Sequence, residues 1–418
     1  MNPLSYFLEY NRYLSFVGIA VIVGIAVLFS NNRKHIPWRL VFIGLALHFA
    51  LGFAVLKTTI GRDIVVSIAN AFSHLYTAAD IGITFLFGNL SDASLPWGFI
   101  FAIKVLPVIV FFGALMSLLF YLGIIQRVVQ GINAVIRPLL GTTGPETLCA
   151  VANSFLGQTE APLLIKHYLP TMTKSEFLVM MISGMGTISG SILAVFAVMG
   201  VPATHLIAAS VMAIPATILI SKIIYPETED TDAICQATAS IEVNAGNALD
   251  AISQGTSDGM WLAFNVGAML ISFLALLGVI NNLLIYGCTN FNYYSALQIP
   301  ILTLNTIFAW VGLPFGWLLG FTGTEALQAG QLIGTKIAVN EVVAYSEMLK
   351  MGLSERTVAV FTYALCGFSN FSCIGIQIGG IGALVPEKRK WLSELGMRAV
   401  LGGALANLLS AMVANLLL

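Results

Sequence analysis

The sequence predicts an all-α polytopic membrane protein with eight transmembrane helices and two re-entrant helical hairpins in an inverted repeat. Composition is the first reason. Of 418 residues, 58% are hydrophobic and 9% are charged, against roughly 25% charged in an average soluble domain. So little charge cannot cover the surface of a soluble enzyme. The net charge of −1 excludes a nucleic-acid partner, which needs a basic surface.

Eight apolar segments are the second reason, because each has close to the about twenty residues that cross a bilayer. They lie at 13–30, 39–58, 99–124, 175–199, 203–225, 256–282, 354–380 and 391–418. Lys and Arg gather in the loops that one orientation of these spans places in the cytoplasm, and this bias sets orientation. An even number of spans then predicts that both termini face the outside.

Two interrupted segments are the third reason. Segments 143–172 and 312–348 are apolar but are broken midway, by GQTEAP at 157–162 and by GTEA at 323–326. A charge at the centre of a membrane helix costs roughly 2.5–3.5 kcal/mol, so these glutamates need a function or a partner. We expect two re-entrant hairpins that enter from opposite faces. Short interrupted segments at matching places in two halves of a chain indicate the substrate site of a transporter.

The hairpins divide the chain into two matching halves, each a hairpin followed by two spans. The predicted regions are scaffold helices at 1–124, half of a transport domain at 125–225, a cytoplasmic linker at 226–255, scaffold span and interfacial helix at 256–311, and the second half of the transport domain at 312–418. The first transport half begins with an amphipathic interfacial helix. The scaffold regions would contact membrane lipid.

Polar residues at the hairpins and at two helix interruptions are the candidates for binding. Gln158, Thr159 and Glu160 follow Gly157 and are candidates for contact with a ligand. The alternative is that these polar groups only form hydrogen bonds with one another and hold the tip of the hairpin. Glu325 is the counterpart of Glu160. Glu341 has two possible roles that the sequence does not separate: a functional role in the site, or a structural ion pair with Lys336.

Two spans contain runs of Gly and Ser, at 183–191 and 366–373. Small residues alone more often indicate close helix packing. The Asn370 amide and the Phe368 ring favour binding in the second run. The first run offers hydroxyl and carbonyl oxygens, which suit a small cation.

Three motifs resemble the signatures of concentrative nucleoside transporters of the bacterial type: GQTEAP at 157–162, NEVVAY at 340–345 and CGFSNFS at 366–372. The resemblance covers nearly the whole chain. It implies a cation-coupled nucleoside symporter, not an enzyme, with an elevator-like moving domain. It also implies a homotrimer in the bacterial inner membrane, with Na⁺ or H⁺ as coupling ion and no organic cofactor.

The resemblance also implies roles for individual residues. Nucleobase contacts fall to Gln158, Thr159 and Glu160, ribose contacts to Glu325, Asn370 and Cys373, and apolar pocket contacts to Ile192, Leu262 and Phe368. The implied sodium site consists of Asn153, Leu156, Thr187 and Ile188. Cys373 and Thr187 both replace a serine of the family pattern. The thiol is a weak donor that would weaken one sugar contact, whereas Thr187 keeps the hydroxyl.

Three alternatives differ in mechanism. Proton coupling would use Glu160 or Glu325 as the titrating group. A passive facilitator would use the same pocket without concentrating its substrate. An intramembrane hydrolase acting through the two glutamates is disfavoured, because the sequence has neither a metal-binding cluster nor an activated nucleophile.

Overall fold

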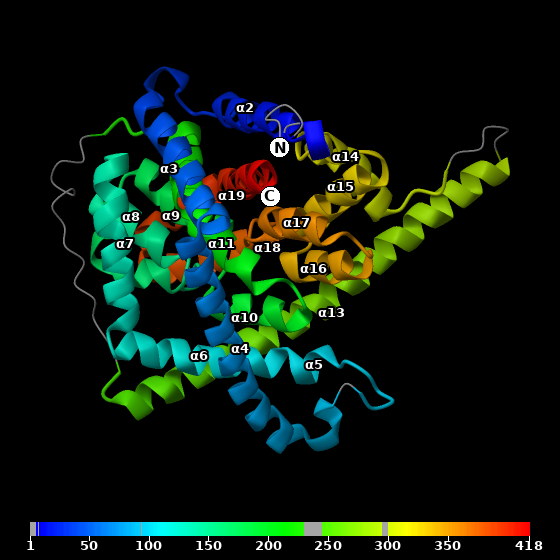
Figure 1. The fold of residues 1–418 in the computed structure, drawn as a ribbon, viewed down its shortest axis with the longest axis horizontal. Coiled ribbons are helices and arrows are strands. Elements are labelled where there is room, and N and C mark those ends of the chain that lie inside the picture. The colour runs from blue at the N-terminus through cyan, green and yellow to red at the C-terminus, as the bar shows by residue number, and fades with distance from the viewer. Residues whose placement is uncertain (1–5, 7, 93, 230–244, 295–299) are drawn as a thin grey trace.

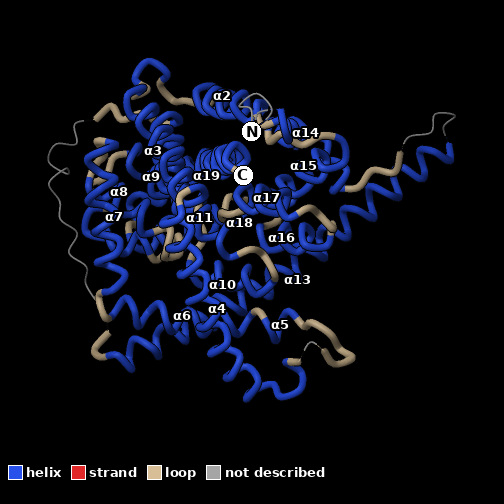
Figure 2. The backbone as a smooth tube through the Cα atoms, viewed as in Figure 1, coloured by secondary structure: helices blue, strands red, loops and turns tan. Residues whose placement is uncertain are grey.

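The computed structural model describes residues 6, 8–92, 94–229, 245–294 and 300–418, and these fold into helices joined by loops (Figure 1; Figure 2). Within this part of the chain, eight helical segments are long and apolar enough to cross a membrane. The pair α14 (Leu304–Leu318) and α15 (Gly323–Ala338) adds a broken segment, bent by 115°. The predicted all-α membrane fold is confirmed. Residues 230–244 of the predicted linker 226–255 and residues 295–299 of the segment 256–311 lie outside the described residues. The end of the predicted linker, 248–255, is not a loop but the first part of α13 (Ala248–Tyr294).

The helices of the first third of the chain and α13 form the periphery. They are α2 (Tyr13–Leu28), α3 (Trp38–Lys57), α4 (Thr59–Phe87), α5 (Phe101–Lys104), α6 (Leu106–Tyr121) and α13 (Ala248–Tyr294). Between 0% and 28% of the most apolar part of each such span is buried within the chain. An apolar helix exposed on most of its sides needs apolar surroundings. These helices therefore face lipid or other protein chains.

Two peripheral helices, α6 and α13, touch through glycine. A Cβ on Gly255 would lie 2.5 Å from the Gly113 carbonyl oxygen, and one on Gly259 would lie 2.8 Å from the Val110 Cα atom. Gly255 and Gly259 are four residues apart and share one face of α13, the spacing that lets membrane helices approach closely. No larger side chain fits between these two backbones, so α6 and α13 pack as one unit.

Helix α4 was missing from the predicted spans. Charged residues such as Arg62, Asp63 and Asp80 interrupt its apolar pattern, although its 29 residues form a continuous helix. Lys104 of α5 forms an ion pair with Asp80 at 2.7 Å, and this pair accounts for two charges in neighbouring apolar helices.

Three spans form the interior. They are α9 (Lys174–Gly186) with α10 (Gly190–Met199), α11 (Ala203–Ile224) and α19 (Arg389–Leu417). Between 94% and 100% of their most apolar parts is buried within the chain, and Figure 1 shows α11 and α19 surrounded by other helices. The protein thus has a buried helical core and an exposed periphery, both apolar.

The first hairpin has the predicted position. It consists of α8 (Gly144–Ala152) and the 3-10 helix Ala161–Tyr168, joined by a turn at 153–160. Thr143 and Glu146 form a reciprocal capping box that fixes the start of α8.

The second predicted hairpin, 312–348, contains two turns rather than one. Residues 319–322 join α14 to α15, and Val339 and Asn340 join α15 to α16 (Glu341–Lys350). The GTEA peptide therefore begins α15. The tip between two antiparallel arms is instead at Asn340, whose side chain accepts a hydrogen bond from the Val343 amide and so caps α16.

Both predicted helix interruptions are confirmed. One separates α9 from α10 at residues 187–189, and the other separates α17 (Glu355–Leu365) from α18 (Phe371–Leu384) at 366–370. Ser189 and Asn370 cap the helices that follow. The predicted span 354–380 is thus two shorter helices. The amphipathic segment predicted at 125–141 forms α7 (Ile124–Leu140).

Candidate functional site

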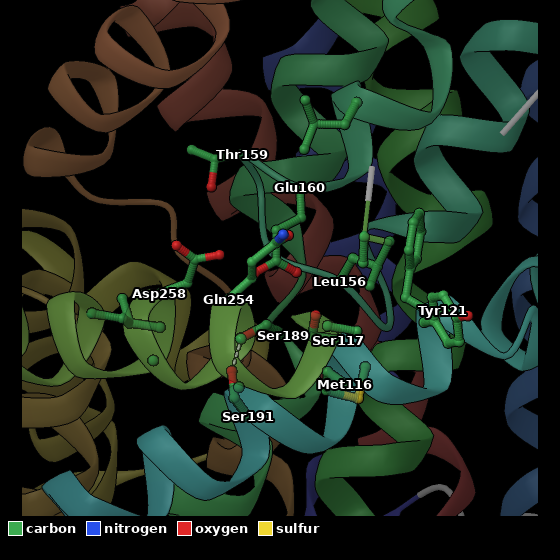
Figure 3. A pocket seen from close by; sticks show the side chains of 18 of the residues that line it. Met116, Ser117, Tyr121, Leu156, Thr159, Glu160, Ser189, Ser191, Gln254 and Asp258 are labelled. Atoms are coloured by element: carbon green, nitrogen blue, oxygen red, sulfur yellow. Dashed lines mark hydrogen bonds between the residues drawn. The ribbon is translucent and has the colours of Figure 1, made fainter. Parts of the chain in front are cut away.

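A cavity of about 610 Å³ lies between the first hairpin, α6 and α13 (Figure 3). The hairpin contributes Leu156, Thr159 and Glu160 of the predicted residues. Figure 3 shows Gln254 and Asp258 of α13 facing these hairpin residues. The cavity is polar on both sides, and it separates part of the interior from the periphery.

The turn of the first hairpin is stabilised by its own carboxylate. Glu160 Oε2 accepts a hydrogen bond from the Gly157 amide at 3.2 Å, and the Glu160 side chain lines the cavity. Asp258 is the nearest acidic partner across the cavity. The predicted candidate Glu160 is therefore accessible to a solute.

The second hairpin brings Glu341 to the α17/α18 break. Asn370 Nδ2 donates to Glu341 Oε2 at 3.0 Å, and both residues are buried. Asn370 Oδ1 accepts from the Cys373 amide and from the Ser372 hydroxyl. Glu341 is thus in direct contact with the predicted ribose-binding residue. Lys336, its other expected partner, is hydrogen-bonded elsewhere.

Glu325 does not join this group. Its Oε1 accepts from the Thr357 hydroxyl at 3.0 Å. Thr357 is in the first turn of α17, whereas the break follows the last turn. At 1.5 Å per residue, nine residues separate Thr357 from Cys366 by about 13 Å. Because GTEA starts α15 instead of forming the tip, Glu325 lies at the far end of α17 from Asn370.

Gln158 faces α18 with a partner that the sequence analysis missed. Gln377 Nε2 donates to Gln158 Oε1 at 3.1 Å and to the Met181 carbonyl at 3.0 Å. The Cys373 thiol also interacts with the side chains of Gln158 and Asn370. Gln377 is fully buried. A glutamine within the apolar run 371–384 was the available signal for it.

The apolar candidates surround these polar groups without forming one cluster. Ile192 is buried in the first turn of α10, and Leu262 lines the cavity from α13. Phe368 is half-buried at the second break, where its amide donates to the Thr187 carbonyl. That hydrogen bond joins the two breaks directly.

Two of the residues predicted to hold sodium, Asn153 and Thr187, meet at the first break. Thr187 Oγ1 lies 2.8 Å from the Asn153 carbonyl and 2.7 Å from the Ser183 carbonyl. Asn153 Nδ2 donates to the Ser183 hydroxyl at 2.8 Å, whereas the buried Asn153 Oδ1 has no hydrogen-bond partner. Leu156 and Ile188 are buried nearby in the chain. An unpartnered oxygen beside freed helix carbonyls suits a small cation.

Two further residues join both breaks from inside. Lys336 Nζ donates to the Ala364 carbonyl at 3.0 Å and to Asn407 Oδ1 at 2.6 Å. Asn407 Nδ2 donates to the carbonyls of Gly186 and Cys366, both at 2.7 Å. These carbonyls are freed where α9 and α17 end. Asn407 was not among the predicted residues, because nothing in the sequence of α19 distinguishes it.

Three family descriptions together cover most of the chain. Residues 205–415 match "Na+ dependent nucleoside transporter C-terminus", residues 17–90 match the corresponding N-terminus, and residues 102–203 match a "nucleoside recognition" gate. The chain belongs to the concentrative nucleoside transporter family. The resemblance inferred from the three motifs is confirmed, as is the prediction that the protein is a transporter and not an enzyme.

Relatives of known sequence share nearly the full length of this family member. It is 45% identical over 411 residues to an uncharacterized transporter of Haemophilus influenzae, covering 96% of this chain and 97% of that one. It is 39% identical to the nucleoside permease NupC of Helicobacter pylori, covering 97% and 98%.

Solved structures share the fold. CNTnw in an inward-facing, substrate-bound state has a TM-score of 0.90 and 38% identity, with 97% of each chain covered. A CNTnw variant in an outward-facing state matches with the same TM-score, identity and coverage. Relatives of this transporter thus occupy states that open to opposite sides of the membrane.

Proposed function

We propose that this transporter imports nucleosides by symport with sodium, moving them with an elevator-like alternating-access mechanism. The observation that supports this function is the chain of polar contacts from Glu341 through Asn370 and Cys373 to Gln158. It joins both hairpins inside an apolar core. A nucleoside has a sugar rich in hydroxyls and a base with donors and acceptors, and it needs such a set of partners.

In this proposal the base lies against the first hairpin and the ribose against the second break. Gln158, Thr159 and Glu160 contact the base. Asn370 contacts the ribose. We assign the carboxylate that accepts hydrogen bonds from the ribose hydroxyls to Glu341 instead of Glu325. Glu341 touches Asn370 at 3.0 Å, whereas Glu325 is occupied by Thr357.

The remaining predicted contacts complete the pocket. Phe368, Ile192 and Leu262 supply apolar surface on which a heterocycle can stack or pack. Cys373 takes the place of a ribose-binding hydroxyl and makes that contact weaker, because a thiol is a poor hydrogen-bond donor.

We propose Asn153, Leu156, Thr187 and Ile188 as the sodium site. The unpartnered Asn153 Oδ1 and the Thr187 hydroxyl supply side-chain oxygens, and Leu156 and Ile188 would supply carbonyl oxygens. A sodium ion there would hold the first hairpin against the first break. Gln158, five residues after Asn153, would then be fixed in place for the base.

The moving part in this mechanism is the transport domain, residues 125–225 and 312–418. Residues 1–124 and 256–311 form the scaffold. Across the cavity of Figure 3, α6 and α13 face the first hairpin. We further propose a homotrimer in the bacterial inner membrane, with both termini outside. Support comes from α13, whose most apolar part is 0% buried in one chain and is available to other chains or to lipid.

The sodium gradient supplies enough free energy. One cation moving through 100 mV releases about 2.3 kcal/mol, and a tenfold concentration ratio adds about 1.4 kcal/mol. The sum, roughly 3.7 kcal/mol, supports about a 500-fold nucleoside gradient at one-to-one coupling.

Uptake of radiolabelled uridine into proteoliposomes tests the function. We expect accumulation above equilibrium under an imposed sodium gradient, and none under a proton gradient alone. Asn153→Ala should raise the sodium concentration for half-maximal uptake about tenfold, whereas Val151→Ala, a buried α8 control, should leave it unchanged. Equilibration without accumulation under either gradient would indicate a passive facilitator and would contradict symport.

Proton coupling is the second candidate, because Glu160 faces Asp258 across the cavity. Two carboxylates in one cavity can share a proton. If protons alone drive accumulation, and Glu160→Gln but not Glu325→Gln abolishes it, then the coupling ion is the proton.

A further inference from the structure

One face of α18 receives the tip of the first hairpin. Cys373, Gln377 and Gly380 are spaced four and then three residues apart, so they lie on the same side of the helix. Cys373 and Gln377 contact Gln158, and a Cβ on Gly380 would lie 2.5 Å from Thr159 Cγ2. The hairpin residues assigned to the base are therefore seated on a helix of the opposite half of the chain.

Space for this contact comes from Gly184 of α9. A Cβ at that position would lie 2.8 Å from Gln158 Cβ and 3.1 Å from Gln377 Nε2. Both glutamines thus lie across the bare backbone of α9. Gln158 and Gln377 are 7% and 0% exposed, so the protein surrounds them closely.

The amide of Gln377 has only one possible orientation. The Met181 carbonyl can accept a hydrogen bond but cannot donate one, so the Gln377 group 3.0 Å from it must be the NH₂. The same nitrogen lies 3.1 Å from Gln158 and donates its second proton there. The Gln158 atom facing Gln377 must then be the oxygen, because two NH₂ groups would repel each other.

We propose that Gln377 is a positioning residue that fixes the orientation of the Gln158 amide and thereby sets base selectivity. With its oxygen fixed toward Gln377, Gln158 directs its NH₂ toward the Cys373 sulfur and the remaining side, where one N–H is left for the base. The base must offer a hydrogen-bond acceptor opposite that NH₂. This inference rests on the proposed function, in which Gln158 contacts the base.

Uridine and cytidine are suitable probes, because they differ only at positions 3 and 4 of the base. There uracil has an N–H donor and an O4 acceptor, whereas cytosine has a ring-nitrogen acceptor and an N4 donor. A reversed Gln158 amide exchanges donor and acceptor in the same way. The ratio of the two dissociation constants therefore reports the amide orientation, which general damage to the site does not change.

Two substitutions of Gln377 have different expected results. Gln377→Glu, in its ionised form, supplies an acceptor in place of the donor, so the Gln158 NH₂ turns toward it. We expect the uridine-to-cytidine ratio to change by about tenfold, equivalent to about 1.4 kcal/mol. Gln377→Met keeps the side-chain length but frees the Gln158 amide, and a smaller change in the same direction is expected. Ile381→Val, a buried control on the same helix, should leave the ratio unchanged.

Binding of both nucleosides to the purified full chain is measured for each variant, with Gln158→Met as the reference. If Gln158→Met leaves both affinities unchanged, the proposed base contact is wrong. A second outcome is that Gln158→Met weakens binding, but the uridine-to-cytidine ratio in both Gln377 variants stays within twofold of that of the unmodified protein. This result would overturn the orienting role of Gln377 and would leave the proposed base contact of Gln158 intact. An equal loss of uridine and cytidine affinity in the Gln377 variants would also overturn the orienting role, because it would show that the Gln377 contact is purely structural.

Discussion

The two helix breaks satisfy their freed backbone groups in different ways. At the α9/α10 break every partner is neutral: Thr187, Asn153, Ser183 and the Asn407 amide. At the α17/α18 break a buried ammonium takes part, because Lys336 donates to the Ala364 carbonyl. The neutral break leaves one buried oxygen, Asn153 Oδ1, without a partner.

This difference supports the proposal that the coupling cation binds at the first break and not at the second. The ends of α9 and α17 both carry the partial negative charge of a helix C-terminus. Lys336 already donates hydrogen bonds at the second end, whereas a sodium ion can supply a partner at the first. Asn407 bonds to both ends and holds them side by side. We therefore expect one sodium per transport cycle, at the first break.

The largest effect should follow from Lys336→Met, which makes the second break neutral. The Ala364 carbonyl loses its donor, and an orphaned buried acceptor costs about 1–3 kcal/mol. Asn407 Oδ1 also loses a donor and keeps only the hydrogen bond from the Ser369 hydroxyl at 3.4 Å. We expect uptake to be lost and the unfolding midpoint in detergent to fall by several degrees. Lys174→Met, at a partly exposed ion pair with Glu394, should cost about 0–1 kcal/mol. Normal stability and uptake in Lys336→Met would show that the break needs no charge.

A smaller effect should separate the two acidic candidates of the second half. Glu341→Gln removes a charged acceptor beside Asn370, and hydrogen bonds to charged groups contribute about 1.5–3 kcal/mol. We expect nucleoside affinity, measured by calorimetry, to fall by about ten- to a hundredfold. Glu325→Gln is the matched control and should change affinity less than about twofold. The reverse pattern would return the ribose contact to Glu325.

At the first break, Asn153→Ala removes the unpartnered oxygen. We expect the sodium concentration for half-maximal uptake to rise about tenfold, or about 1.4 kcal/mol, with a smaller change in nucleoside affinity at saturating sodium. The measurement is uptake against sodium concentration at fixed uridine, with Val151→Ala as control. An unchanged sodium dependence would remove Asn153 from the ion site.

The smallest effect belongs to Thr187→Ser, which keeps the hydroxyl and removes a methyl group. We expect sodium dependence to change less than about threefold, whereas Thr187→Val should match Asn153→Ala. Equal behaviour of the Ser and Val variants would mean that the Thr187 oxygen does not bind the ion.

Much of the architecture could be read from the sequence because apolar length and helix-breaking residues are local signals. The first hairpin and both interruptions followed from Gly, Pro and Ser within apolar runs. Helix α4 was missed because Arg62 and Asp63 lower the apolar signal of a helix that is otherwise continuous. The charge of Asp80, also in α4, is offset by an ion pair with Lys104. The two residues are far apart in the sequence, so no short sequence pattern indicates the pair.

The candidate site was harder to predict for the same reason. Glu325 resembles Glu160 in its short peptide, but its neighbourhood depends on where the hairpin turns, and the turn is at Asn340. Gln377 and Asn407 act through contacts with residues about 200 positions away along the chain. A single polar residue in an apolar helix indicates some partner but does not identify it.

The length of α13 sets the depth of the protein in the bilayer. Its 47 residues extend about 70 Å at 1.5 Å per residue, while the hydrocarbon layer is about 30 Å thick. Even at a tilt of about 40°, the upper end for membrane helices, roughly 20 of its residues must stand outside the hydrocarbon. Near its C-terminal end, Asn281 accepts a hydrogen bond from the Leu304 amide at the start of α14. This hydrogen bond ties α13 to the start of α14 within the scaffold region, and residues 282–294 of α13 extend beyond it (Figure 1).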